Sequence, residues 1–385
     1  MDRALSASVI AGLGELEALQ DEWAELLAAS ATDTPMLGPA WLLAWWHTFG
    51  SLDGRKLRIW VFRANGRLVG LVPMHLRWFW HWGVLPMRRL ELLGSGEQEK
   101  DEIVSEYLAP IAAVGYEDAV VDAFVKCLAA DPSGWHEILL SQLAAEAPTV
   151  AALDPAFRAA GWSCEVRIQA HCPFIKLPAR WGDYLSSLES ANRYFVNRTQ
   201  RDFAAWAGDA WRVERVTTKA DLERGREILR RLHQQRWENA GEPGVFSSSL
   251  FSQFHNRVLP RLLDEKALDL CWLSVRDRPV AVAYNIIWRN RVFFYQGGRA
   301  TDVPKQVRPG IVLHLEAIKH SIAEGRQEYD FLAGDVRYKT QLATSTRTLV
   351  GMRIVRPSLA EAVRRLLETG RTFLREARQS RKSAG

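Results

Sequence analysis

The chain has 385 residues, which is long for a single hydrophobic core, so we expect two domains. Its apolar fraction of 48% and charged fraction of 25% are those of an ordinary globular protein. Most of the net charge of +5 lies in residues 358–385, which hold seven basic and three acidic side chains. The body of the chain is therefore close to neutral, which argues against a general nucleic-acid-binding surface.

The sequence also lacks the patterns of a membrane span, an export signal and a zinc site. No run of 18 apolar residues occurs, and the first residues show no basic segment followed by an apolar one. The four cysteines form no CxxC pair and have no zinc-type histidine spacing. Cys164 and Cys172 are close enough in sequence to bridge, but a reducing compartment disfavours a disulfide. We expect a cytoplasmic protein without a metal.

The first half of the chain alternates between helical and strand patterns. Leucine and tryptophan recur at helical spacing in residues 15–30, and a tryptophan-rich helix is predicted over 41–49. Alternation predicts a strand over 57–63. Asn65-Gly66 then favours a tight hairpin turn, because both residues tolerate positive φ, and residues 67–76 would return as the partner strand.

The second half repeats this order. Strands are predicted over 270–275, 280–288 and 292–296, with a turn at Asp277-Arg278 between the first two. An amphipathic helix (310–324) and a further strand (328–333) follow. Because both halves contain the same strand–turn–strand unit, the sequence indicates a duplicated α/β architecture.

The most informative segment is YDFLAGDVRYK, residues 329–339. It begins as an apolar strand, passes a glycine and ends in a cluster of polar and ionisable side chains. Upstream lie the loop QVRPG, residues 306–310, and the predicted helix. In this order of loop, helix, strand and polar segment, a helix N-terminus can hold a phosphate beside a reaction centre.

These segments resemble the C-terminal signature of the CelD/BcsL-type acetyltransferases, a branch of the GNAT superfamily associated with cellulose and exopolysaccharide synthesis. Three further segments resemble other parts of that family, so that the likeness covers most of residues 20–355: GPAWLLAWW (38–46), LVGLVPM (68–74) and LHQQRW (232–237). The resemblance implies an α/β fold of two tandem GNAT-like domains, with mixed, mostly antiparallel sheets flanked by helices. It also implies acyl transfer from a thioester.

On this reading the chain divides into three parts. Residues 1–175 would form the N-terminal GNAT-like domain, and residues 176–356 the C-terminal one, which would hold the acyl-CoA and catalytic site. Residues 357–385 would form a basic amphipathic helical tail, opened by a capping box of Ser358 and Glu361. Such a tail could lie on an anionic membrane surface or bind RNA, or it could simply pack one face and solvate the other.

The resemblance places the cofactor contacts at the loop before the predicted helix. Gln306, Arg308, Gly310 and Ile311 would hold the pyrophosphate of acyl-CoA, because a helix N-terminus presents free N–H groups and a favourable dipole. Arg308 could add a bidentate contact. The usual family loop has two glycines, whereas this chain has one glycine and a proline. The alternative is an ordinary helix start, where proline and glycine are common.

The polar segment supplies the candidate catalytic groups. Acyl transfer needs a base for the acceptor, donors for the oxyanion and an acid for the departing thiolate. Tyr338 is the candidate acid, Asp335 a base or an acceptor-orienting carboxylate, and Lys339 a stabiliser of negative charge. The alternative is structural: Asp330 or Asp335 would pair with Arg337 or Lys339, and Tyr338 would pack.

Outside this segment, His233 and Glu238 are further candidate bases. His233 could form one wall of the acceptor site with Arg236, which is three residues away on the same helical face. A lone histidine is also commonly a hydrogen-bonded structural residue.

Two aromatic clusters are present. Trp41 and Trp45 are four residues apart and predicted to be core. Trp78, Trp80 and Trp82 alternate, so they share one side of an extended segment. That side is either a buried seam or an exposed patch that marks a partner or ligand, and a seam or lid is favoured over a platform for sugar rings.

We therefore predict an acyl-CoA-dependent acyltransferase. The acceptor would be an amine or hydroxyl of a sugar or of an envelope or exopolysaccharide precursor, acylated by direct transfer. The basic tail would give peripheral contact with the inner membrane or with a polysaccharide-synthesis complex. Two alternatives stay open: a Fem-type transferase that takes its acyl group from aminoacyl-tRNA, and a degenerate GNAT scaffold in polysaccharide synthesis.

Overall fold

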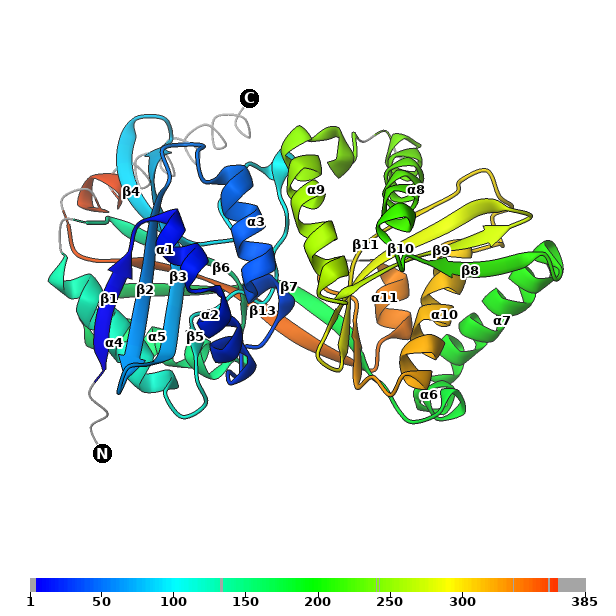
Figure 1. Ribbon diagram of the computed structural model, residues 1–385, viewed down its shortest axis with the longest axis horizontal. Helices are drawn as coiled ribbons and strands as arrows, with labels where there is room; N and C mark the ends of the chain where they lie inside the picture. The colour runs from blue at the N-terminus through cyan, green and yellow to red at the C-terminus, as the bar shows by residue number, and fades with distance from the viewer. Residues whose placement is uncertain are drawn as a thin grey trace, which may run out of the picture.

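The computed structural model describes residues 5–131, 134–239, 241, 243–334, 336–358 and 361–365, and it places the two halves of the chain side by side (Figure 1). The first half contains β1 (Ser6–Ile10), α1 (Leu13–Ala18), α2 (Gln20–Ala28), α3 (Pro39–Phe49), β2 (Lys56–Ala64), β3 (Arg67–His81), β4 (Leu85–Leu92), β5 (Ile111–Ala112), α4 (Glu117–Ala130), β6 (Glu137–Ala144), α5 (Pro148–Ala159) and β7 (Ser163–Lys176).

The second half repeats the sequence of elements. It contains α6 (Trp181–Ser187), α7 (Ser190–Ala207), β8 (Trp211–Arg215), α8 (Lys219–Glu238), α9 (Ser249–Asp264), β9 (Leu268–Val275), β10 (Arg278–Trp288), β11 (Arg291–Arg299), α10 (Pro309–Ala323), β12 (Glu328–Asp330), α11 (Arg337–Leu342) and β13 (Ser345–Val355). The predicted α/β class and each of the strands and helices predicted in both halves are confirmed, with ends that differ by a few residues.

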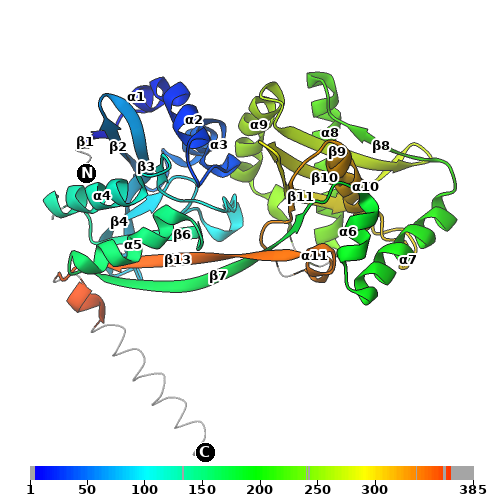
Figure 2. The same cartoon turned by 90° about the horizontal axis from the view of Figure 1, so that it is seen from below.

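A single sheet joins the two halves. Its strand order within the described residues is β1-β2-β3-β4-β6-β13-β7-β12-β11-β10-β9-β8, with β5 beside β3. The last strand of the chain, β13, lies between β6 and β7 and pairs antiparallel with both. Figure 2 shows β7 and β13 as a long ribbon that runs beneath the first half and reaches α11 of the second. The predicted domain limits at residues 175 and 176 stay a prediction.

Each half is built on the same pattern of strand pairing. Three antiparallel strands are followed by a crossover helix and a strand parallel to the third: β2-β3-β4, α4 and β6 in the first half, and β9-β10-β11, α10 and β12 in the second. Each parallel pairing is short, because only three residue pairs are in register in each. Beyond these pairs the two strands diverge, and each half has a split in its sheet.

Local sequence accounts for several of these elements. Asn65 and Gly66 have φ of 50° and 81°, the two positive values that a tight hairpin turn between β2 and β3 requires. α10 is apolar around most of its surface and is correspondingly buried.

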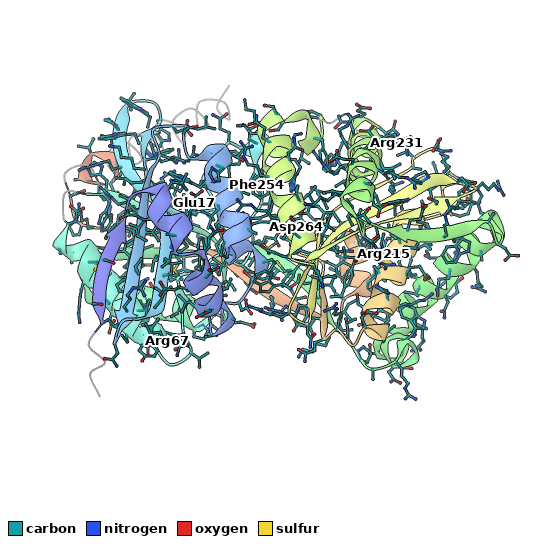
Figure 3. The ribbon with its side chains drawn as sticks, in the orientation of Figure 1. Glu17, Arg67, Arg215, Arg231, Phe254 and Asp264 are labelled. Atoms are coloured by element: carbon teal, nitrogen blue, oxygen red, sulfur yellow. The ribbon has the colours of Figure 1, made fainter. Side chains whose placement is uncertain are left out.

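Packing between α3 and α9 joins the halves above the sheet. Trp41, fully buried, lies 4.8 Å from Phe254 and 5.3 Å from Tyr295, measured between ring centroids. Figure 3 labels Phe254 at this junction. Trp45 is also fully buried, so the prediction that both tryptophans belong to the core is confirmed.

Other sequence predictions are corrected or fall outside the described residues. Trp78, Trp80 and Trp82 are exposed, so the prediction of a buried seam is wrong, because alternation fixes a shared side but not what covers it. All four cysteines are free thiols. Ser358 Oγ accepts the N–H of Glu361 at 3.2 Å, as a cap would, but most of the predicted tail lies outside the described residues.

Two kinds of feature are absent from the described ranges. No helix there is both long and apolar enough to cross a bilayer. No group of three or more His, Cys, Asp or Glu side chains in those ranges is arranged to hold a metal ion.

Candidate active site

The split between β11 and β12 is the structural basis of the site. β11 pairs with β12 only through Arg291, Val292 and Phe293, and then leaves it. Just beyond this point β11 bulges: Tyr284 of β10 faces Gln296, and the next residue of β10 faces Phe294, which leaves one extra residue on β11. A bulge bends a strand locally and is a common device beside active sites.

A cavity of about 390 Å³ lies at this split. Its walls come from α8, β10, β11, the loop before α10, α10 itself and the segment around α11, with these lining residues: Arg236, Val282, Ala283, Phe294, Gly297, Gly298, Arg299, Lys305, Val307, Arg308, Gly310, Ile311, His314, Val336 and Tyr338. Its size is that of a small-molecule site.

The cavity is strongly cationic. Arg236, Arg299, Lys305 and Arg308 line it, and no Asp or Glu is among the described residues that do so. Burial lowers the pKa of the Arg299 guanidinium, and the charge of Arg236 lowers it further. Asp202 Oδ2 lies 4.0 Å from Arg308 Nη1 and offsets part of this charge, but Asp202 does not line the cavity. The remaining positive charge creates a potential that an anionic ligand would relieve.

The N-terminus of α10 opens into the same cavity. Arg308 is the N-cap and Pro309 the first helical residue, whose lack of an N–H costs nothing there. The other N–H groups of the first turn have no acceptor within the helix. A Cβ on Gly310 would lie no closer than 3.7 Å to the Arg299 side chain, so glycine leaves open space at this turn.

Arg308 is supported from α7. Its Nη1 donates to Thr199 Oγ1 at 3.4 Å, and its guanidinium lies 5.4 Å from the centre of the Phe195 ring. α7 therefore holds this cation at the rim of the cavity. Arg308, Gly310 and Ile311 line the cavity as a cofactor site would require, whereas Gln306 is exposed and does not line it.

Tyr338 faces the cavity from the start of α11. Its ring stacks on His314 of α10, with centroids 5.1 Å apart and planes 29° apart. Burial raises the pKa of Tyr338 to about 12, so its hydroxyl carries a proton at neutral pH and could donate it. Burial lowers the pKa of His314 to about 3, so the stacked imidazole is neutral.

Lys339 does not line the cavity. Its Nζ donates to the carbonyl oxygens of Phe331 at 2.8 Å and Leu332 at 3.4 Å, and also to that of Ala333. Burial lowers the pKa of this amine. The connection it binds is strained, since Leu332 has a φ of 55°. Lys339 thus fixes the backbone between β12 and α11.

The first half of the chain holds the same connection from the other side. Both carboxylate oxygens of Glu106 lie 3.0 Å from the N–H of Ala333, which they accept. Tyr107 donates its hydroxyl proton to Asp330 Oδ2 at 2.8 Å. Burial raises the pKa of Glu106, and the charge of Asp330 adds to that rise. These contacts join residues more than 220 positions apart, a distance at which sequence patterns carry no signal.

His233 does not line the cavity. It is fully buried, and its Nε2 accepts the indole N–H of Trp237 at 2.9 Å. A Cβ on Gly298 would lie 2.4 Å from the His233 backbone nitrogen, so α8 packs directly on β11 here. Of the pair expected to form one wall, only Arg236 reaches the cavity. Asp335 lies outside the described residues. The roles predicted for these side chains stay predictions.

The corresponding split in the first half is filled by the chain itself. The N–H of Leu108 donates to the carbonyl of Gln142, just beyond the parallel pairing of β4 with β6, at 3.0 Å. Residues Ile103, Tyr107 and Leu108 of this segment are buried. The crossover helix α4 begins with Glu117 and Asp118, so its N-terminus is already supplied with negative charge.

Comparison with known proteins agrees with this geometry. Residues 190–340 match the model of an acetyltransferase (GNAT) domain family. This region spans α7 to α11 and contains the residues that line the cavity. The match supports membership of the GNAT superfamily. It also supports an acyltransferase activity. The comparison with curated proteins gave no match.

Three solved structures are similar across nearly the whole chain. FemX has a TM-score of 0.61 at 11% identity, with 94% of this chain and 100% of that chain covered. A conserved protein of unknown function from Bacteroides thetaiotaomicron has a TM-score of 0.54 at 12% identity, with 88% of this chain and 97% of that chain covered. The C-terminal domain of a putative lysylphosphatidylglycerol synthetase from Agrobacterium fabrum has a TM-score of 0.51 at 10% identity, with 92% of this chain and 96% of that chain covered. At these identities the likeness concerns the fold, which is a tandem of GNAT-like halves.

Proposed function

We propose that this protein is an acyl-CoA-dependent acyltransferase of the CelD/BcsL type that uses the split of its second half. The observation that carries the proposal is the cavity at the start of α10, which four cations line and no described carboxylate does. Acyl-CoA bears a pyrophosphate and a 3′-phosphate at one end and a thioester at the other. The cations and the α10 N-terminus suit the phosphates, and the split suits the acyl end.

The chemistry then follows from the position of Tyr338. A lone pair of the acceptor amine or hydroxyl attacks the thioester carbonyl, and a tetrahedral oxyanion forms. When the carbon–sulfur bond breaks, the thiolate takes the proton of the Tyr338 hydroxyl, which is protonated at neutral pH. We keep Asp335 as the base for the proton that the acceptor loses. Lys339 acts on this step by fixing the backbone that precedes Tyr338.

The resemblance to the CelD/BcsL family supplies the acceptor class. We propose an amine or hydroxyl of a sugar or of an envelope or exopolysaccharide precursor, acylated in the cytoplasm. Peripheral contact through the basic tail belongs to the same proposal.

A second candidate is a Fem-type transferase with aminoacyl-tRNA as donor. It is favoured by the similarity of the fold to FemX over the whole length of that chain, and a cationic cavity would also suit a phosphate of the 3′ end of tRNA. A scaffold without catalysis is the third alternative, which a failure of the cavity to bind any acyl donor would favour.

Thermal unfolding with graded ligands separates these candidates. CoA, 3′-dephospho-CoA and pantetheine carry three, two and no phosphate groups, so they can offer a decreasing number of anionic contacts to the cavity cations. A ligand at 100 times its Kd stabilises the native state by about 2.7 kcal/mol. We expect stabilisation to fall from CoA to pantetheine at equal concentration. No stabilisation by any of the three, with retardation of aminoacyl-tRNA in a gel, would favour the second candidate.

A further inference from the structure

A chain of buried hydrogen bonds crosses the second half and ends at the cavity. Arg215, which Figure 3 labels, donates its Nε–H to Asp269 Oδ1 at 3.1 Å. Asn285 Nδ2 donates to the other oxygen of that carboxylate at 2.9 Å. Tyr329 donates its hydroxyl proton to Asn285 Oδ1 at 3.2 Å. His314 Nδ1 lies 3.2 Å from the same hydroxyl oxygen, and the His314 side chain lines the cavity.

The direction of these bonds follows from the Asp269 carboxylate. A carboxylate only accepts hydrogen bonds, so Asn285 must turn its amide N–H groups toward Asp269 and its carbonyl oxygen toward Tyr329. The carbonyl oxygen also only accepts, so the Tyr329 hydroxyl must donate to it. Burial raises the pKa of Tyr329 well above its usual value, so that hydroxyl carries its proton. With the proton engaged, the Tyr329 oxygen can only accept from His314.

This polarity fixes the tautomer of His314. Nδ1 must carry the proton that the Tyr329 oxygen accepts. The imidazole is neutral, because burial lowers its pKa to about 3, so Nε2 holds a lone pair. Nε2 has no hydrogen-bond partner among the described residues, and it is the ring nitrogen left for a ligand in the cavity. The four cations that line the cavity only donate hydrogen bonds, so His314 supplies an acceptor that they cannot.

The neighbouring Tyr338 indicates which ligand group meets this acceptor. Its ring stacks on His314 with centroids 5.1 Å apart, and in the proposed function its hydroxyl protonates the sulfur of CoA. In CoA an amide N–H lies two carbon atoms from that sulfur. An N–H that leaves water for a cavity needs an acceptor there, since an unpaired buried donor is costly. The acceptor beside Tyr338 is therefore in the right place for this amide.

We propose that His314 Nε2 accepts the hydrogen bond of the pantetheine amide N–H next to the sulfur of acyl-CoA. His314 thereby holds the thioester beside Tyr338. Asp269, Asn285 and Tyr329 act through His314, because they hold it in the tautomer that accepts. The inference rests on the proposed function, and it assigns recognition of the uncharged arm of CoA, which the cavity cations do not provide.

Titration calorimetry of the full chain with two probes tests the proposal. CoA carries the amide, whereas adenosine 3′,5′-bisphosphate carries phosphates without the pantetheine arm. His314→Phe keeps a ring for stacking but removes the acceptor, so it should lower CoA affinity roughly fivefold to tenfold and leave the affinity for the bisphosphate unchanged. His314→Gln should recover part of the loss, since its amide oxygen can replace Nε2. His320→Phe is the matched control, because His320 is exposed on the same helix, and it should bind both probes as the wild type does.

NMR of the chain with nitrogen-labelled histidine reads the tautomer itself. The imidazole whose signals disappear in His314→Phe should be protonated at Nδ1 and not at Nε2. Tyr329→Phe should move His314 toward the other tautomer and lower CoA affinity without lowering affinity for the bisphosphate. The opposite tautomer in the wild type, unchanged CoA affinity in His314→Phe, or an equal loss for both probes would overturn the inference and leave the proposed function standing. A wild type that binds neither probe would overturn both.

Discussion

The two halves share one order of strands and helices, but the split in the sheet is open in one half and filled in the other. In the second half the split is open, and the crossover helix α10 begins at Arg308 among cations. In the first half the split holds the chain's own segment around Leu108, and the crossover helix α4 begins with Glu117 and Asp118. The two halves therefore differ in the features that the proposed site requires: an open split, and a helix start without acidic side chains.

The filled half nevertheless contributes to the site. Tyr295, beside the bulge of β11, donates its hydroxyl proton to the carbonyl of Ile103 at 2.6 Å. Glu106 and Tyr107 of the same segment hold the end of β12. The segment that closes the first split therefore braces the second one. On the proposed function, one half holds the site and the other half supports it.

The largest expected effect concerns the proposed acid. Tyr338→Phe should lower kcat roughly 10²–10⁴-fold, because the thiolate would leave without its proton donor, while CoA binding stays intact. Release of free CoA thiol under single-turnover conditions measures this. The matched change in the first half, Tyr116→Phe at the start of α4, should leave kcat unchanged. Activity of Tyr338→Phe within a few-fold of wild type would remove Tyr338 from the mechanism.

Charge reversal in the cavity comes next. Each charge-assisted hydrogen bond contributes about 1.5–3 kcal/mol, so Arg299→Glu with Arg308→Glu should weaken CoA binding at least about 100-fold. The converse change in the first half, Glu117→Arg with Asp118→Arg, should create no second CoA site, because the split there is filled. CoA affinity measured by equilibrium dialysis checks both. A second site in the converse variant would show that charge alone, and not the open split, decides between the halves.

The halves should also differ in their response to acid. Burial lowers the pKa of four histidines to about 3 or 4, one in the first half and three in the second: His75, His233, His255 and His314. The unfolded chain binds protons at these sites below about pH 6.5, but the folded chain does so only near pH 3 to 4. The free energy of unfolding therefore falls as pH drops through this window, by about 1 kcal/mol per histidine at pH 5.5.

Hydrogen exchange resolved by peptide measures this difference. Between pH 7.5 and 5.5 the second half should lose protection before the first, after correction for the intrinsic exchange rate. Equal losses in the two halves would contradict the assignment of these histidines as buried and neutral.

The smallest expected effect concerns the start of α10. Gly310→Leu should fold, since the nearest atom to an added Cβ is 3.7 Å away, and should weaken CoA binding about tenfold by filling the cavity. Gly298→Ala should instead destabilise the protein, because its Cβ would meet the backbone of α8. Unchanged CoA affinity in Gly310→Leu would rule out a contact of this turn with the cofactor.

Sequence patterns predicted the structural features that depend on residues close together in the chain. The positive φ values of Asn65 and Gly66, the helix that begins at Pro309 and the buried pair Trp41 and Trp45 all follow from neighbouring residues. The resemblance supplied the tandem fold and directed attention to the loop before α10, where Arg308 lines the cavity.

What the sequence could not supply is convergence from distant segments. Arg236, Arg299 and Lys305 reach one cavity from three elements, and no spacing rule links them. Glu106 meets Ala333 only because the first half fills its own split. The place of β13 between β6 and β7 likewise depends on pairing across the whole chain. Adjacent positions in the sequence were also a poor guide, since Tyr338 lines the cavity whereas Lys339 does not and instead donates to the carbonyl of Phe331.

Isothermal titration of the wild-type chain with CoA tests the central claim most directly. The account predicts one site per chain with micromolar affinity, and its loss in the Arg299→Glu, Arg308→Glu variant. Two sites would contradict the filled split of the first half. No binding, or binding that survives the charge reversal, would contradict the assignment of the α10 cavity as the acyl-CoA site.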